Sequence, residues 1–300
     1  MCTYNGERFL KEQLASFSAQ THANWQLFVY DDASTDNTHK IIQQYQSTIT
    51  QKLSLRINAS SKGFCKNFLS AICTTPNESG DFFALSDQDD IWQANKLSKA
   101  INHLKTIPSH IPALYCSRTQ TIRDNGEPLG FSPLFKKNPS FKNALVQSIA
   151  GGNTMVFNQA AKILITKAGA TIDVISHDWW IYLLLTGAGG QVFYDPYPEI
   201  LYRQHDSNLV GANSSLRAKL IRFKLLWTDR FKQWTNRNIA ALNTCRPLLE
   251  AKQIKILDTF SRARQSSLLN RLYTLHQLGI YRQTPLGHIA LFAAIFLNKL

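Results

Sequence analysis

The sequence has few cysteines and none of the spacings that define a zinc site or a disulfide framework. Its five cysteines are scattered along 300 residues, and no Cys-x-x-Cys pair occurs. We therefore expect reduced thiols, which are usual in the cytoplasm. The sequence also contains no run of about 20 apolar residues, the length that a membrane-spanning helix needs. Its first residues show no charged segment followed by an apolar one, so no secretory signal peptide is predicted there.

Acidic residues are scarce in the last part of the chain. Residues 214–300 hold 3 Asp and Glu against 15 Lys and Arg, whereas residues 1–213 hold 17 against 18. We therefore predict two units, a near-neutral domain over residues 1–213 and a basic helical region over residues 214–300. Basic regions favour polyanions such as nucleic acid or the anionic cytoplasmic leaflet of a membrane.

Hydrophobic periodicity predicts alternating strands and helices in the first unit. Strands are predicted at residues 25–30, 53–57, 82–86 and 113–117, with helices at about residues 7–19, 64–72 and 95–104 between them. This alternation with short connections predicts an α/β fold with a mostly parallel sheet, whose ligands bind at the carboxyl ends of the strands. Residues 127–142 are rich in proline and glycine, and we expect a loop that covers the acceptor side.

The apolar segment 82–86 reads as a buried strand that ends in a cluster of carboxylates. Side chains alternate along an extended backbone, so Asp87 and Asp89 are expected to point the same way. Two ionised carboxylates so close repel each other unless a cation lies between them. Hard oxygen ligands of this kind suit Mg²⁺ or Mn²⁺ that bridges to a phosphate. The alternative is an acidic turn, with Asp90 or Asn95 capping the helix that follows.

The pattern is helical from Leu216 onward. Apolar positions in this region include Trp227, Trp234 and residues 289–297, a run too short to span a bilayer. Together with the excess of basic residues, they predict peripheral attachment to an anionic membrane surface. The alternative is a solvated basic helical bundle that packs on the first unit.

Four motifs occur along the first unit: Cys-Thr-Tyr-Asn-Gly at 2–6, Asp-Asp-Ala-Ser-Thr-Asp at 31–36, Ser-Asp-Gln-Asp-Asp-Ile-Trp at 86–92, and His-Asp-Trp-Trp at 177–180. With this set the chain resembles the family 2 glycosyltransferases, which are inverting enzymes with the GT-A fold. It looks most like bacterial members that assemble cell-surface polysaccharide, including rhamnosyltransferases. The resemblance covers about residues 1–211 and does not extend to the helical region.

The resemblance implies three groups of site residues. The nucleotide of a nucleotide-diphosphate sugar donor would be bound by Thr3, Tyr4, Asn5, Asp31, Asp32, Asp87 and Arg203. The divalent metal, Mg²⁺ or Mn²⁺, would be bound by Asp89 and His205. The general base that takes the proton from the acceptor hydroxyl would be Asp178.

Inverting transfer needs these residue types. The reaction is an in-line displacement, so charge develops on the departing nucleoside diphosphate, and a cation together with Arg203 would neutralise it. On the opposite side the acceptor hydroxyl must lose a proton to a carboxylate. The neighbours of Asp178, Trp179 and Trp180, would desolvate that carboxylate and raise its pKa.

Simpler structural roles are open for several of these residues. Asp178 is also placed to be the N-cap of a helix over residues 179–185. Asp32 ends a predicted strand and is placed to contact a helix N-terminus. His205 suits a structural role as well as metal binding.

The start of the chain departs from the family pattern. Family members carry a full hydrophobic strand before the Cys-Thr-Tyr-Asn motif, whereas only Met1 precedes it here. A shortened first strand would leave backbone groups of its neighbours unpaired. We expect either a start codon assigned too late or a broken reading frame. In-frame upstream codons for about six further residues, roughly one strand, would support the first.

These observations predict a metal-dependent glycosyltransferase that acts on a glycan or lipid-linked saccharide acceptor, in the cytoplasm or peripherally at the cytoplasmic face of the inner membrane. One alternative is a sugar-nucleotide nucleotidyltransferase, but residues 1–12 lack the glycine-rich phosphate loop that such enzymes use. Another is a nucleic-acid-binding protein, although the basic residues avoid the unit that carries the motifs. An inactive remnant is the third. We expect no nucleic acid among the partners.

Overall fold

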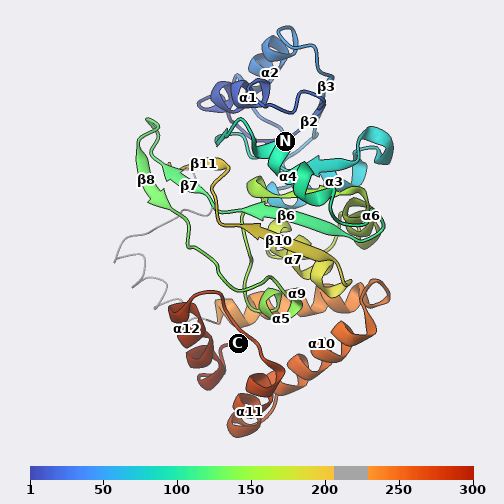
Figure 1. Cartoon of the computed structure of the whole chain (residues 1–300), viewed down its shortest axis with the longest axis vertical. Helices are drawn as coiled ribbons and strands as arrows, with labels where there is room; N and C mark the ends of the chain where they lie inside the picture. Colours follow the sequence, from blue (N-terminus) through green and yellow to red (C-terminus); the bar gives the residue numbers. More distant parts are fainter. Residues whose placement is uncertain (206–228) are drawn as a thin grey trace.

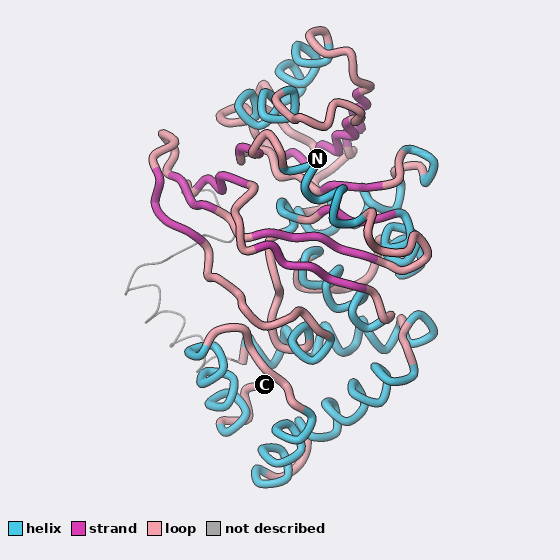
Figure 2. Tube along the Cα trace, viewed as in Figure 1, coloured by secondary structure: helices cyan, strands magenta, loops and turns pink. Residues whose placement is uncertain are grey.

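The structure is a computed structural model, and it describes residues 1–205 and 229–300. Figure 1 shows three tiers along the longest axis of the molecule. The helices α1 and α2 lie at one end with the strands β2 and β3. A central sheet follows, and the C-terminal helices α9 to α12 form the other end. Figure 2 shows the same arrangement by type of secondary structure.

The strands are β1 (Cys2–Thr3), β2 (Leu27–Asp31), β3 (Leu53–Ile57), β4 (Phe82–Ala84), β5 (Ile91–Trp92), β6 (Ala113–Ser117), β7 (Gln120–Ile122), β8 (Pro128–Phe131), β9 (Val156–Asn158), β10 (Gln191–Asp195) and β11 (Ile200–Arg203). The helices are α1 (Leu10–Ser18), α2 (Thr38–Gln46), α3 (Phe64–Thr74), α4 (Lys96–Leu104), α5 (Phe141–Ala144), α6 (Gln159–Ala168), α7 (His177–Gly187), α9 (Arg230–Thr244), α10 (Ala251–Arg264), α11 (Leu268–Leu278) and α12 (Pro285–Phe296). Short 3₁₀ helices are η1 (Asn77–Ser79), η2 (Gly152–Thr154) and η3 (Arg246–Leu248).

The central layer is a mixed, mostly parallel sheet. The strands β1, β2 and β3 are parallel neighbours, and a second group has the order β10-β6-β9-β4. The amide of Cys2 donates to the carbonyl of Ser86 (3.1 Å), just beyond β4, and this bond links the two groups. β10 runs parallel to β6, and β9 runs antiparallel to both of its neighbours. This topology, with helices on its faces, confirms the predicted fold class.

Alternating side chains divide the core between the two faces of the sheet. On β6, Leu114 and Cys116 pack with α3, α6 and α7, whereas Ala113 and Tyr115 pack with α4. The predicted strand at 82–86 is shorter than expected, and its residues in β4 are half-buried instead of buried. Phe82 faces the α4 side and Phe83 the α7 side, so each face receives one ring.

The first strand is as short as the sequence predicts. β1 contains two residues and pairs in parallel with β2. Three backbone bonds hold it there: the Met1 amino group donates to the Phe28 carbonyl (2.8 Å), and the Tyr30 and Asp32 amides donate to the Met1 (2.9 Å) and Thr3 (2.8 Å) carbonyls.

A smaller sheet of order β5-β11-β7-β8 lies beside the central layer. The expectation that residues 127–142 form only a loop is wrong for Pro128–Phe131, which is the edge strand β8. The proline is tolerated because it lies at a bulge on the edge of the sheet. In this small sheet β11 pairs with β5, so the end of β11 lies beside the segment between β4 and β5.

The C-terminal helices share one apolar core with the central sheet. Trp234 of α9 meets Trp179 of α7 edge-on, with ring centroids 6.3 Å apart, and Leu242, Leu257 and Phe260 are buried in the same cluster. The region is thus helical and packed on the first unit as far as it is described. The predicted apolar position Trp227 lies outside the described residues. Within the described part, no helix combines the length and the apolar character needed to cross a membrane.

Candidate active site

Four segments that follow strands meet at one edge of the sheet, and they carry most of the predicted site residues. They follow β1, β2, β4 and β11, in line with the rule that ligands bind at the carboxyl ends of strands. The side chain of Gln88 joins two of them, because its Oε1 accepts from the Tyr4 amide (2.8 Å) and its Nε2 donates to the Tyr4 carbonyl (3.0 Å). The Thr3 hydroxyl joins the β1 segment to the β2 segment by donating to Oδ2 of Asp31 (2.7 Å).

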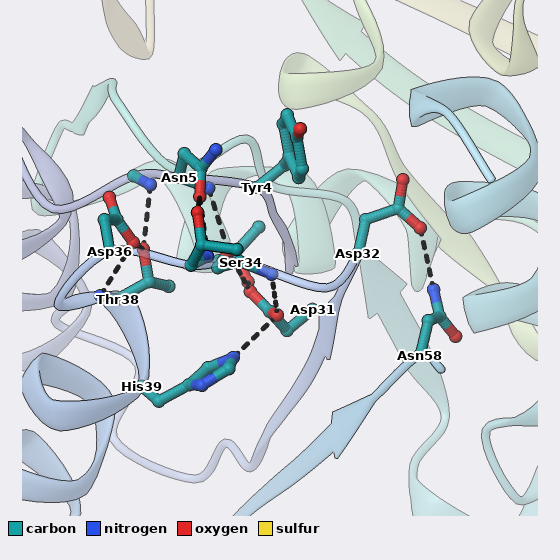
Figure 3. Close-up of polar contacts among 12 residues, drawn as sticks. Tyr4, Asn5, Asp31, Asp32, Ser34, Asp36, Thr38, His39 and Asn58 are labelled. Atoms are coloured by element: carbon teal, nitrogen blue, oxygen red, sulfur yellow. Dashed lines mark hydrogen bonds and ion pairs between the residues drawn. The ribbon is translucent and has the colours of Figure 1, made fainter. Parts of the chain in front are cut away.

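Asp31 is fully buried, and both of its carboxylate oxygens have partners within the protein (Figure 3). Oδ1 accepts from the Ser34 amide (2.8 Å) and lies 2.7 Å from Nε2 of His39. Oδ2 accepts from the hydroxyls of Ser34 (2.5 Å) and Thr3 (2.7 Å). Burial opposes ionisation, but these hydrogen bonds outweigh it and hold the pKa of Asp31 below its ordinary value. Asp31 therefore braces the loop after β2, and its part in nucleotide binding stays a prediction.

Asp32 points the other way, toward the segment that precedes α3 (Figure 3). Its carboxylate accepts hydrogen bonds from Asn58 (2.9 Å), the Ser61 hydroxyl (2.7 Å) and the amides of Lys62 and Gly63 (both 2.9 Å). Burial again opposes ionisation, yet the hydrogen bonds lower the pKa of Asp32. Asp32 thus contacts the N-terminus of α3, the structural role that the sequence left open.

The loop after β1 is fixed by its backbone and presents one aromatic ring. The Asn5 amide donates to the Ser34 hydroxyl (2.8 Å), and Oδ1 of Asn5 accepts from the Thr35 amide (2.9 Å). Asn5 has a φ of 47°, a conformation that Asn tolerates better than most residues. The side chain of Tyr4 is 53% exposed, so its ring is available to stack on a planar group.

The carboxylate of Asp87 has no hydrogen-bond donor among the described residues. Burial is the main cause that raises its pKa, and the nearby negative charges of Asp89 and Asp178 add to it, so that the pKa of Asp87 rises to about 7. A carboxyl group in this state gives up its proton readily to an incoming cation.

The two predicted metal ligands lie side by side. Nε2 of His205 is 2.9 Å from Oδ2 of Asp89, and the imidazole stacks on Phe9 with ring centroids 5.1 Å apart. Oδ1 of Asp89 accepts no hydrogen bond from the described residues. One carboxylate oxygen of this pair therefore remains available.

Arg203 is buried, and its guanidinium is surrounded by protein groups. It donates to the carbonyls of Asp89 (3.1 Å) and Asp124 (2.5 Å) and to the carboxylate of Glu12 (2.6 Å). It also lies 4.6 Å from the centroid of the Phe9 ring. In this arrangement Arg203 holds the acidic segment in place, and its contact with a donor diphosphate stays a prediction.

Asp90 ties three segments together, a role that the sequence analysis did not predict. Oδ2 accepts from the Asn153 side chain (2.5 Å), and Oδ1 accepts from the backbone amide of Arg203 (3.2 Å). The Asp90 amide donates to Oε1 of Gln13 (3.1 Å). Asn95 occupies the N-cap position of α4, as one alternative predicted, but its side chain makes no capping hydrogen bond, and Asp90 is not the N-cap residue. The signal that was available is the position of Asp90 beside the predicted pair of carboxylates.

Asp178 lies in the first turn of α7, close enough to Asp87 for their charges to interact. Its Oδ1 accepts from the Ser176 hydroxyl and from the Trp179 amide (2.7 Å). Ser176 occupies the N-cap position, so the alternative that Asp178 is the N-cap is wrong. Oδ2 has no donor among the described residues. Trp179 and Trp180 are both core residues.

The donor set suits a hard divalent cation. No group of three or more His, Cys, Asp and Glu side chains in residues 1–205 and 229–300 is already arranged as a metal site. However, Asp87 and Asp89 are close, oxygen-rich and short of hydrogen-bond donors, and their repulsion is the kind that a cation relieves. Carboxylate oxygens are the ligands that Mg²⁺ and Mn²⁺ prefer. The residues present therefore fit the metal that the resemblance implies.

Comparison with known proteins identifies relatives of this chain. The family described as "Glycosyl transferase family 2" matches residues 1–163. The dTDP-rhamnosyl transferase RfbG of Shigella flexneri is 31% identical over 237 residues, which are 75% of this chain and 78% of that protein. The UDP-Glc:alpha-D-GlcNAc-diphosphoundecaprenol beta-1,3-glucosyltransferase WfgD of Escherichia coli is 36% identical over 102 residues, which are 34% of this chain and 38% of that protein.

Solved structures share the fold. TarS 1–349 of S. aureus, in complex with UDP-GlcNAc, matches with a TM-score of 0.56 at 16% identity and covers 99% of this chain and 87% of its own. The mannosyltransferase PcManGT from Pyrobaculum calidifontis, in complex with GDP-Man and Mn²⁺, matches with a TM-score of 0.50 at 17% identity, over 99% of this chain and 84% of its own. The described residues therefore have the GT-A fold of these glycosyltransferases.

Proposed function

The chain belongs to glycosyltransferase family 2, and on that premise we propose that it transfers a sugar, with inversion, from a nucleoside-diphosphate donor to a hydroxyl of a glycan or lipid-linked saccharide. The proposed setting is the assembly of a bacterial cell-surface polysaccharide. The Shigella flexneri relative is named a dTDP-rhamnosyl transferase, and this makes dTDP-rhamnose the first donor to test.

One observation carries the proposal: the carboxylates of Asp87, Asp89 and Asp178 gather at the carboxyl edge of the sheet without enough donors to satisfy them. In the proposed site Asp87, Asp89 and His205 hold Mg²⁺ or Mn²⁺. The bound cation supplies charge neutralisation for the departing diphosphate. Arg203 keeps the acidic segment in register and adds positive charge beside it.

The nucleoside binds in the proposed site between the loops after β1 and β2. Tyr4 stacks on the base, while Thr3 and Asn5 shape the loop through their bonds to Asp31 and Ser34. Asp32 accepts a hydrogen bond from the base in place of one of its internal donors.

Asp178 acts as the general base in this proposal. Its Oδ2 is free to accept the proton of the acceptor hydroxyl, while Oδ1 is held by Ser176 and Trp179. Residues 1–213 form the catalytic domain, and residues 214–300 attach the protein to the cytoplasmic face of an anionic membrane, beside a lipid-linked acceptor.

A thermal-shift series with nucleoside diphosphates and their sugars, with and without Mn²⁺, tests the donor assignment. A ligand that binds only the folded state raises the midpoint of unfolding. We expect dTDP or another nucleoside diphosphate to raise it in the presence of Mn²⁺. No rise with any nucleotide, together with DNA binding that weakens steeply with salt, would favour the nucleic-acid-binding alternative.

A further inference from the structure

The outer face of α12 is apolar, and no described residue covers it. α12 contains no Asp, Glu, Lys or Arg. Its inner face is buried and consists of Leu291, Ala294 and Ile295. On its outer face Leu286 is 73% exposed, Ile289 is 66% exposed and Phe296 is 59% exposed. A surface helix of a globular protein normally turns polar residues to the solvent, so an exposed apolar face of this kind indicates a binding surface.

The exposed residues form one stripe along the helix. Positions 286, 289, 293 and 296 recur at intervals of three or four, which places them on a single side of an α-helix. Leu297, 40% exposed, extends the stripe beyond the last turn. Figure 1 shows α12 at the end of the molecule opposite α1 and α2.

The surroundings of the stripe are positively charged. No Asp or Glu occurs from Thr259 to Leu300, and this segment contains Arg262, Arg264, Arg271, Arg282 and Lys299. Of these, Arg271 is buried and Lys299 pairs with Asp229 (2.8 Å), so Arg262, Arg264 and Arg282 carry most of this charge. Lys137, from another part of the chain, donates to the carbonyl of Arg282 just before α12 and adds its charge there. An apolar stripe with basic residues around it matches the chemistry of an anionic lipid surface.

We propose that the outer face of α12 docks the protein on an anionic lipid bilayer. The inference rests on the membrane attachment proposed above and assigns that attachment to one helix. α12 lies parallel to the bilayer, with Leu286, Ile289 and Phe296 at the boundary of the acyl chains and the basic residues among the lipid phosphates. Trp234, which the sequence had suggested for this role, packs against Trp179 inside the molecule instead.

A second copy of this chain suits the stripe less well. Two copies joined through α12 would bring like-charged basic surroundings together, and that repulsion opposes association. A stable interface also needs about 800 Å² from each partner, far more than one stripe of four or five side chains offers. An anionic lipid surface would not repel the basic residues and would not need a protein interface of that area.

Co-sedimentation of the whole chain with lipid vesicles tests the proposal. The vesicles are phosphatidylcholine alone or phosphatidylcholine with phosphatidylglycerol. We expect binding to the anionic vesicles, weakened by salt, and little binding to the neutral ones. The double variant Ile289→Ser/Phe296→Ser should bind the anionic vesicles on the order of a hundredfold more weakly, about tenfold for each large apolar side chain.

The matched control is Tyr197→Ser, since Tyr197 is 69% exposed on the catalytic domain. It should bind vesicles as the parent does. Both variants should keep the parent's unfolding temperature and its response to nucleotide and Mn²⁺, which separates this proposal from the proposed transferase activity. Three results would overturn it: no vesicle binding by the parent, equal loss in Tyr197→Ser, or unchanged binding by the double variant. A parent dimer that the double variant abolishes without lipid would assign the stripe to a second copy.

Discussion

Two acidic segments lie at the same edge of the sheet, residues 31–32 and residues 87–90, and their surroundings are opposite. Around Asp31 and Asp32 the carboxylate oxygens are filled by hydrogen-bond donors, and the pKa of each is lowered despite burial. Around Asp87 and Asp90, burial and neighbouring negative charges dominate, and the pKa of each is raised. The same side chain is thus stabilised as an anion in one segment and destabilised as an anion in the other.

This difference separates structural from reactive carboxylates. A carboxylate with all its acceptor positions filled holds loops together and gains little from a cation. Asp90 has donors on both oxygens although its pKa is raised, so the contrast concerns Asp87. A crowded carboxylate without donors retains a repulsion that a divalent cation relieves, and such perturbed groups concentrate at functional sites. Variants of the two segments should therefore fail in different ways, and the following experiments separate them.

The largest effect is expected at Asp178, the third carboxylate near Asp87. Asp178→Asn keeps the shape and the bond partners of the side chain but removes the proton acceptor. We expect single-turnover transfer to fall by roughly 10²–10⁴-fold, the usual contribution of a general base, while calorimetric donor affinity stays at the parent value. Transfer at near the parent rate would show that the base lies elsewhere.

Asp89→Ala should weaken Mn²⁺-dependent donor binding, because it removes an anionic ligand and leaves Asp87 to hold the cation. We expect a loss of about 10–100-fold in calorimetric titration with Mn²⁺. The control is Asp81→Ala, which removes an exposed carboxylate just before β4. Donor binding as tight as that of the parent would mean that the segment is only an acidic turn.

Removing a carboxylate should have opposite effects on stability in the two segments. Asp32→Ala leaves the part-buried donors of Asn58, Lys62 and Gly63 without their acceptor, and we expect the free energy of unfolding to fall by about 1–3 kcal/mol. Asp87→Asn removes a destabilised anion, so in EDTA at pH 8 it should equal or exceed the parent in stability. Urea unfolding measures both, and destabilisation of the two variants alike would break the comparison.

The free energy of unfolding of the metal-free protein should depend on pH in opposite ways through the two segments. The pKa of Asp87 is raised to about 7 in the folded state, so the folded state binds the extra proton. The stability that the folded state gains from this proton on Asp87 is complete below about pH 4 and is lost as the pH rises toward 7. Asp31 and Asp32 have lowered pKa values, so their contribution is present above about pH 4 and is lost on further acidification. Urea unfolding in EDTA from pH 4.5 to 7.5 should show a steeper decline for the parent than for Asp87→Asn.

The smallest effect is expected at Gln88, which links the two nucleotide-side loops. Gln88→Ala removes both bonds to the Tyr4 backbone and should weaken donor binding about fivefold, near 1 kcal/mol. A Cβ on Gly6 would lie 2.4 Å from Oε1 of Gln88, so Gly6→Ala should displace the same side chain. The double variant should then be no weaker than the worse single one. Additive losses would show that the two residues act independently.

Most of the regular elements and the fold class could be predicted from local patterns in the sequence. The strands predicted at 53–57 and 113–117 are β3 and β6 without change, and α3 and α4 begin within a residue of their predicted starts. These elements are readable because hydrophobic periodicity is a local property of the chain. The carboxylates Asp31 and Asp87 follow predicted strands, and the rule that ligands bind at the carboxyl ends of strands predicted their place at one edge of the sheet.

The hydrogen-bond and packing partners of these residues, by contrast, follow from the tertiary structure alone. The short strands β5, β7 and β8 pair with segments far away in sequence, so no local pattern announces them. The carboxylate oxygens of Asp32 accept hydrogen bonds from residues 58–63, and Arg203 donates to Glu12, because the packing of distant segments brings those groups together. In α12 the sequence is apolar all round, and only its packing selects the face that is buried and the face that is left to bind a surface.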